Sequence, residues 1–158
     1  MNILVLCTGN SARSILLECL LSRLGNGVIT SFSAGSQPAG KVHPQSLRLL
    51  AAEGFNVSGL SSKSWDIFAL PDAPKMDAVI TVCGSAANET CPMWPGAPAR
   101  AHWGVEDPAA ASLEDIPAAF KDAYDILARR AAKFTEGLCA DIEVAALQEK
   151  LQACSTLP

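Results

Sequence analysis

The chain has 158 residues, 49% of them hydrophobic, with 12 Lys and Arg against 16 Asp and Glu. This length allows one well-buried core and is short for two ordinary domains. We expect neither nucleic acid nor a membrane as a partner, because no run of Lys or Arg is present and no apolar run is as long as a spanning helix. The first residues lack the basic segment of a signal peptide, so we expect a cytoplasmic protein whose six cysteines stay reduced and serve chemistry.

Strands and helices are predicted to alternate along the chain. Short apolar segments are typical of strands buried in a parallel sheet, and they lie at Asn2–Leu6, Val28–Ser33, Ala78–Val82 and Arg100–Trp103. Apolar residues at helical spacing indicate helices at Ile15–Leu24, Pro44–Gly54, Pro117–Leu138 and Val144–Leu151. This order predicts an α/β fold of three layers, with a four-stranded parallel sheet and helices on both faces. We expect one domain over residues 1–138 and a C-terminal extension over 139–158.

One segment between a predicted strand and a predicted helix has the features of an oxyanion-binding loop. It reads Cys7-Thr8-Gly9-Asn10-Ser11-Ala12-Arg13-Ser14. In such a loop the backbone N–H groups point inward, and the positive end of the helix dipole lies at the same place. Arg13 adds a planar charged fork that can hold two oxygens at once. The segment from Thr8 to Ser14 is therefore expected to bind a tetrahedral oxyanion.

The side chains of this loop predict a nucleophile. Cys7 lies at the base of the positive cup, so we expect the helix dipole, the N–H groups and Arg13 to lower the pKa of its thiol. We expect Gly9 to let the backbone turn, Ser14 to donate to the Cys7 sulfur, and Asn10 to brace the loop. The alternative is a buried cysteine at a strand end beside an ordinary surface arginine.

The chain resembles the low-molecular-weight protein tyrosine phosphatase fold family and, within it, the thiol-coupled arsenate reductases. The resemblance covers most of the chain and leaves only the tail after about Gly137 poorly specified. Besides the oxyanion loop, the matching pieces are Ser33-Ala34-Gly35, His43-Pro44, Thr81-Val82-Cys83, Cys91-Pro92 and His102-Trp103-Gly104-Val105-Glu106-Asp107-Pro108. Many relatives carry a second cysteine directly before the loop arginine, where this chain has Ala12.

Phosphoester hydrolysis and arsenate reduction both need an acid to protonate the departing oxygen, and Asp107 beside Pro108 is the candidate. The alternative for Asp107 is a simple turn residue before proline. Phosphatases of this family that act on tyrosine phosphate usually carry aromatic residues directly after this pair, whereas this chain continues with Ala109 and Ala110. The sequence therefore favours the reduction of arsenate to arsenite and keeps a phosphoester phosphatase using Cys7, Arg13 and Asp107 as the alternative.

Cys83 and Cys91 are the expected resolving thiols. Reduction of arsenate oxidises two thiols, so Cys7 needs a second sulfur within reach. The resemblance implies that Cys83 attacks Cys7 and that Cys91 then resolves the Cys7–Cys83 disulfide. A pair of unrelated buried thiols and a zinc site with His102 are the alternatives, although seven residues between the cysteines do not fit the usual zinc-ligand pairs. Cys19, Cys139 and Cys154 are expected to take no part.

The expected partners follow from this chemistry. Arsenate is the substrate, phosphate and sulfate compete with it, and thioredoxin is favoured over glutaredoxin with glutathione because the chain supplies its own resolving thiols. A non-catalytic redox sensor that binds an oxyanion is a third hypothesis. No cofactor is required, although Asn10 and Ser33 resemble positions that bind a potassium ion in some arsenate reductases. We expect a monomer.

Overall fold

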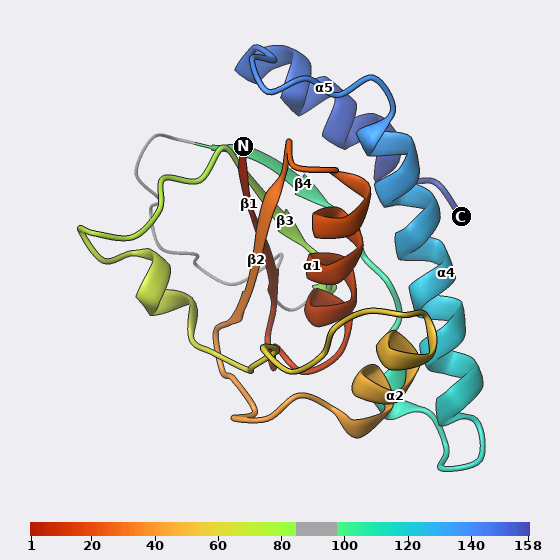
Figure 1. Cartoon of the computed structure of the whole chain (residues 1–158). Coiled ribbons are helices and arrows are strands. Elements are labelled where there is room, and N and C mark those ends of the chain that lie inside the picture. Colours follow the sequence, from red (N-terminus) through yellow and green to blue (C-terminus); the bar gives the residue numbers. More distant parts are fainter. Residues whose placement is uncertain (85–97) are drawn as a thin grey trace.

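A computed structural model describes residues 1–84 and 98–158 and shows a four-stranded parallel sheet. The strands lie in the order β2-β1-β3-β4 (Figure 1). Their bounds are β1 Asn2–Cys7, β2 Thr30–Gly35, β3 Ala78–Thr81 and β4 Ala99–His102. The predicted sheet is confirmed, with strand ends displaced by one or two residues from the sequence-based expectation.

The largest displacement, in β2, has a visible cause. The register pairs Asn2 with Thr30 and Cys7 with Gly35, so β2 starts only where it meets β1. Val28, two residues before Thr30, was expected in the strand. Its carbonyl instead accepts a hydrogen bond from the amino terminus at 2.6 Å. Because all four strands are parallel, Cys7, Gly35 and the segment after β3 end at the same edge of the sheet.

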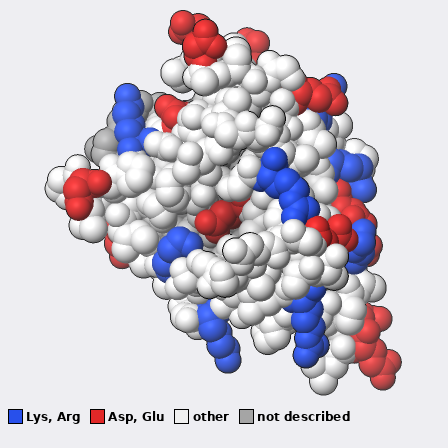
Figure 2. Space-filling model, in the orientation of Figure 1, with Lys and Arg blue, Asp and Glu red and all other residues white. Residues whose placement is uncertain are grey.

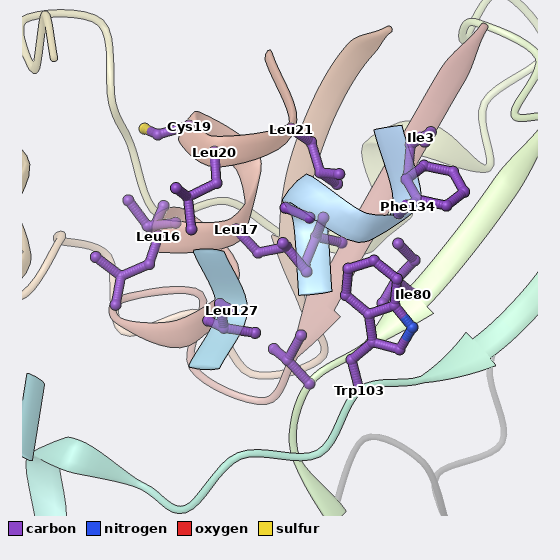
Figure 3. Close-up of a cluster of buried hydrophobic side chains, with 14 of the residues drawn as sticks. Ile3, Leu16, Leu17, Cys19, Leu20, Leu21, Ile80, Trp103, Leu127 and Phe134 are labelled. Carbon is purple, nitrogen blue, oxygen red and sulfur yellow. The ribbon is translucent and has the colours of Figure 1, made fainter. Parts of the chain in front are cut away.

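Within residues 1–84 and 98–158, four α-helices pack on one face of the sheet. They are α1 Arg13–Leu24, α2 Pro44–Ala52, α4 Ile116–Thr135 and α5 Val144–Cys154. Their buried side chains form one core with alternate residues of β1 and β3, and Figure 3 shows Leu17 and Leu21 of α1 near Ile3, Ile80 and Trp103. The positions at helical spacing therefore face the sheet, as the sequence predicts. Ile3, Leu17 and Phe134 of this core are fully buried.

The opposite face of the sheet carries a second, smaller core. Leu4 and Leu6 point to this side and pack with Phe68 and Met76. Phe68 belongs to the short 3₁₀ helix η1, Trp65–Phe68, which was not predicted from the sequence. A second 3₁₀ helix, η2, spans Pro108–Ala110. The three-layer α/β prediction is confirmed, with the α-helical layer of the described residues on one side and η1 with its flanking segments on the other.

Helix α5 is closely joined to the sheet. Leu151 and Cys154 are buried in the main core, and the Gln148 side chain both accepts from the Arg100 N–H at 2.8 Å and donates to the Arg100 carbonyl at 2.6 Å. The indole of Trp103 donates to the Leu151 carbonyl at 3.0 Å. A domain boundary at residue 138 stays a prediction. Among the described residues, no helix is long and apolar enough to cross a membrane.

Candidate active site

Most of the predicted site residues that the structure describes line one cavity at the carboxyl edge of the sheet, whereas Asn10, Ser14 and Ser33 are fully buried and lie outside its lining. The cavity measures about 470 Å³ and is lined by the oxyanion loop, by the residues after β3 and by the segment before η2. Its lining comprises Cys7, Thr8, Gly9, Ser11, Ala12, Arg13, Cys83, Gly84, Val105, Glu106, Asp107 and Ala109. Cys91 lies outside the described residues. Residues from three distant parts of the sequence therefore meet at one place.

Asn10 braces the oxyanion loop from beneath, and it is fully buried. Its side-chain oxygen accepts from the Lys63 N–H at 2.8 Å, and its side-chain nitrogen donates to Ser14 Oγ at 3.0 Å and to Ser33 Oγ at 2.9 Å. The sequence predicts this bracing role but not these partners. Asn10 also has a φ of 42°, in the left-handed region that most residues avoid and asparagine tolerates.

The turn of the loop does not depend on Gly9. A Cβ on Gly9 would meet only Ser11 Oγ at 3.7 Å, an ordinary contact, so the expected steric role of this glycine is wrong. The glycine that the loop needs is Gly35 on the neighbouring strand. A Cβ there would lie 2.3 Å from the Thr8 carbonyl oxygen, which the backbone does not allow. Close approach of β2 to the loop thus depends on Gly35.

Cys7 is almost fully buried at the base of the cavity. Its sulfur lies 2.9 Å from Ser14 Oγ and accepts a hydrogen bond from the Asn10 N–H at 3.1 Å. Burial raises the pKa of the Cys7 thiol, while these two hydrogen bonds act to lower it and the nearby Cys83 thiol raises it further. The pKa of Cys7 is therefore raised and not lowered as expected, because the sequence shows the donors but not the desolvation.

Arg13 is the first residue of α1, and its guanidinium is held from the opposite wall. One nitrogen donates to the Val105 carbonyl at 2.9 Å and another pairs with the Asp107 carboxylate at 3.0 Å. The second Asp107 oxygen accepts from the Ala109 N–H and caps η2. The side chain of Arg13 is 14% exposed and that of Asp107 is 47% exposed. An incoming oxyanion would compete with the Asp107 carboxylate for the guanidinium.

Cys83 lies just beyond the end of β3 and is buried beside the oxyanion loop. Its sulfur lies 3.6 Å from Thr8 Oγ1. Cys7 and Cys83 both line this cavity.

Sequence reasoning missed Glu18, which lies on α1 behind the loop. Its carboxylate accepts a hydrogen bond from Ser33 Oγ, and Lys63 Nζ lies 4.0 Å away. Burial raises the pKa of Glu18, while the Ser33 hydrogen bond and the Lys63 charge act to lower it. A charged residue within an apolar helix pattern is usually exposed, so only the position of β2 beside α1 reveals that this carboxylate is enclosed.

The remaining cysteines and histidines lie away from the cavity. Cys19 and Cys154 are buried, and burial raises the pKa of Cys19 to about 12, whereas Cys139 is exposed. His43 caps α2, as its position before Pro44 predicts, by accepting from the Gln45 N–H at 3.1 Å. Within residues 1–84 and 98–158, no group of three His, Cys, Asp or Glu could hold a metal ion.

The model of the low molecular weight phosphotyrosine protein phosphatase family matches residues 2–152 of this chain. The chain therefore belongs to this family. It is 35% identical over 133 residues to the arsenate reductase of Bacillus subtilis (strain 168), a match that covers 83% of this chain and 92% of that protein. The arsenate reductase of Brevibacillus brevis is 33% identical over 131 residues, with 83% and 91% covered.

Known structures of the same fold include reductases and a phosphatase. The arsenate reductase of Archaeoglobus fulgidus superposes with a TM-score of 0.66 at 25% identity and covers 85% of this chain and 98% of its own. The thioredoxin-dependent arsenate reductase of Corynebacterium glutamicum gives 0.60 at 26% identity, with 85% and 61% covered. The tyrosine phosphatase Wzb of Escherichia coli, in complex with sulphate, gives 0.70 at 24% identity, with 87% and 98% covered, and this likeness shows the fold alone.

Proposed function

We propose that this protein reduces arsenate to arsenite. The observation that carries the proposal is a single cavity that holds Cys7, Arg13 and Asp107 together with a second thiol, Cys83. A phosphatase has no use for that second thiol, whereas reduction of arsenate by two electrons consumes two. Similarity to arsenate reductases over 83% of the chain supports the same conclusion.

The first step joins Cys7 to arsenic. The backbone N–H groups of the loop and Arg13 hold the oxyanion, and Arg13 exchanges its contact with the Asp107 carboxylate for the bound substrate. The Cys7 sulfur bonds to arsenic as its proton passes to the bound arsenate, and Asp107, released from Arg13, relays that proton to the departing hydroxyl oxygen, which leaves as water. Burial raises the pKa of the Cys7 thiol, while the contacts with Ser14 and the Asn10 N–H act to lower it and stabilise the thiolate.

The second step reduces arsenic. The Cys83 sulfur attacks the Cys7 sulfur, the electron pair of the sulfur–arsenic bond stays on arsenic, and arsenite leaves. The Cys7–Cys83 disulfide has then taken up the two oxidising equivalents of arsenate. Thr8 lies against the Cys83 sulfur and holds it at the cavity. In sum, one arsenate and two thiols give arsenite, water and one disulfide.

The third step restores Cys7. Cys91 attacks Cys83 and releases Cys7 as a thiol, which leaves a Cys83–Cys91 disulfide for an external dithiol to reduce. We propose thioredoxin as that reductant because a chain with its own resolving thiols does not need glutathione, and the Corynebacterium glutamicum relative is thioredoxin-dependent. We also propose that the protein works in the reducing cytoplasm as a monomer.

Phosphoester hydrolysis is the second candidate, because Cys7, Arg13 and Asp107 suffice for it and the family is named for it. Among the residues that the structure describes, the lining of the cavity contains no aromatic side chain. The small residue Ala109, two positions after Asp107, is part of that lining. A tyrosine ring would therefore find no stacking partner there. We expect slow hydrolysis of small phosphoesters at most.

Multiple turnover separates the two activities. With thioredoxin, thioredoxin reductase and NADPH, the wild type should reduce many equivalents of arsenate. Cys83→Ser should lose multiple turnover and keep its rate on p-nitrophenyl phosphate, while the matched control Cys139→Ser, at an exposed site, should keep both activities. If Cys83→Ser retained steady arsenate reduction, the reductase proposal would fail.

A further inference from the structure

A buried chain of hydrogen bonds runs from Glu18 to the nucleophile. Ser33 Oγ donates to the Glu18 carboxylate and accepts from the Asn10 side-chain nitrogen, which also donates to Ser14 Oγ. Ser14 Oγ accepts from Asn10 and lies 2.9 Å from the Cys7 sulfur, so its own proton is available to that sulfur. Asn10, Ser14 and Ser33 are each fully buried, so no exposed group interrupts the chain.

Lys63 closes this chain at its far end. Its N–H donates to the Asn10 side-chain oxygen at 2.8 Å, and its carbonyl accepts from the Gly35 N–H at 3.0 Å, so its backbone is fixed between the loop and β2. Its ammonium lies 4.0 Å from the Glu18 carboxylate and donates to the Ser61 carbonyl at 3.2 Å. The Lys63 and Glu18 side chains are only 25% and 17% exposed.

A potassium ion does not fit this arrangement. It would need several oxygen ligands at one point, yet the Asn10 side-chain oxygen accepts from Lys63 and the Ser33 hydroxyl is used by Asn10 and Glu18. The negative charge of Glu18 already has a monovalent cation beside it, the ammonium of Lys63. Asn10 and Ser33 therefore serve the hydrogen-bond chain and not a metal site.

We propose that the Lys63 ammonium, paired with Glu18, takes the place of a bound cation. The pair positions Asn10 and Ser14 against Cys7, so that the loop has no need of added potassium. A charged carboxylate can only accept, so it fixes Ser33 as the donor, and the ammonium favours that charge. Lys63 and Glu18 are positioning residues, since neither contacts the oxyanion cavity. The proposal rests on the nucleophilic role of Cys7 and holds equally for arsenate reduction and phosphoester hydrolysis.

The test measures the reactivity of Cys7 without any substrate. Each variant is alkylated with iodoacetamide across a range of pH in sodium or potassium chloride of equal ionic strength, and the Cys7 peptide is quantified by mass spectrometry. The wild type should give one profile in both salts. Lys63→Met should move the midpoint upward by roughly half a pH unit or more. Lys63→Arg should restore the wild-type midpoint, and Lys75→Met, at an exposed site, should not change it.

Ser33→Ala keeps the proposal testable if Lys63→Met does not fold, as circular dichroism would reveal. It cuts the chain between Glu18 and Asn10 without changing any charge, and it should raise the midpoint in the same direction. A wild-type profile that differs between sodium and potassium, or an unchanged midpoint in Lys63→Met or Ser33→Ala, would overturn the proposal. A purely structural role would lower the melting temperature and leave the midpoint in place. Because arsenate is absent, these outcomes do not depend on the reductase proposal.

Discussion

The two walls of the cavity are built in opposite ways. The oxyanion loop rests on Asn10 and Ser14, which are fully buried and joined to Cys7 by hydrogen bonds. The facing segment from Val105 to Asp107 is partly exposed, and Asp107 reaches Arg13 through one salt bridge. The difference teaches that the proposed nucleophile is placed by the core, whereas the proposed acid and the selectivity of the cavity depend on a wall that can exchange partners.

The largest effect should follow from the buried wall. Cys7→Ser retains the size of the nucleophile but removes the sulfur, and we expect loss of both arsenate reduction and phosphoester hydrolysis by about 10⁴-fold or more. Initial rates with purified protein check this. Cys19→Ser is the control, since Cys19 is buried in α1 away from the cavity. Residual activity near that of the control would show that another residue is the nucleophile.

Asp107→Asn, on the exposed wall, should slow catalysis and strengthen the binding of an oxyanion. The amide cannot supply a proton, so kcat should fall about 10²- to 10⁴-fold. It also no longer neutralises Arg13, so phosphate should inhibit at a lower concentration than in the wild type. Steady-state kinetics with phosphate as inhibitor measures both. Asp122→Asn, at an exposed position on α4, should change neither. Weaker phosphate binding in Asp107→Asn would contradict competition between Asp107 and the oxyanion.

Ser14→Ala should change the pH dependence of Cys7. Burial raises the pKa of this thiol above its ordinary value of 9.0, so the alkylation rate of the wild type should still be rising at that pH. The Ser14 contact acts to lower the pKa, and its removal should shift the profile upward by about one pH unit. Ser155→Ala, in the tail, is the control. A wild-type rate that levels off below neutral pH would show a lowered pKa instead.

The smallest effect tests the selectivity of the exposed wall. Ala109→Tyr would place a ring beside the acid, where the described lining has none. A stacked aromatic pair contributes about 0.5 to 1.5 kcal/mol, so kcat/KM for p-nitrophenyl phosphate should rise about two- to tenfold while arsenate reduction changes little. Ala110→Tyr, one residue further on and not in the lining, is the matched control. An equal gain in both variants would argue against this wall.

Local patterns predicted most of the fold and part of the site. The strand-loop-helix order placed Cys7 and Arg13, and the ends of the predicted strands placed Cys83 and the segment with Asp107 at the same edge. What failed depends on contacts between distant segments. Burial reversed the expected pKa shift of Cys7, and the need for glycine falls at Gly35 of β2 instead of Gly9.

The features that were not predicted, η1 and the role of Lys63, have only weak signals in the local sequence. The helix η1 has only four residues, too few for a helical period, and forms because Phe68 fills the second core. Lys63 looks like an ordinary solvated charge in a polar segment until its ammonium is seen beside Glu18. The mixed charges on the face in Figure 2 form no single large patch. Charge composition alone also gave no indication of the Lys63–Glu18 pair.

Disulfide mapping tests the central claim most directly. The reduced protein is incubated with arsenate, quenched with an alkylating agent, digested and analysed by mass spectrometry, with phosphate in place of arsenate as the control. We predict a Cys83–Cys91 disulfide only with arsenate, and a trapped Cys7–Cys83 disulfide in Cys91→Ser. If arsenate left all six cysteines reduced while a phosphoester was hydrolysed, the protein would be a phosphatase and the thiol relay would be wrong.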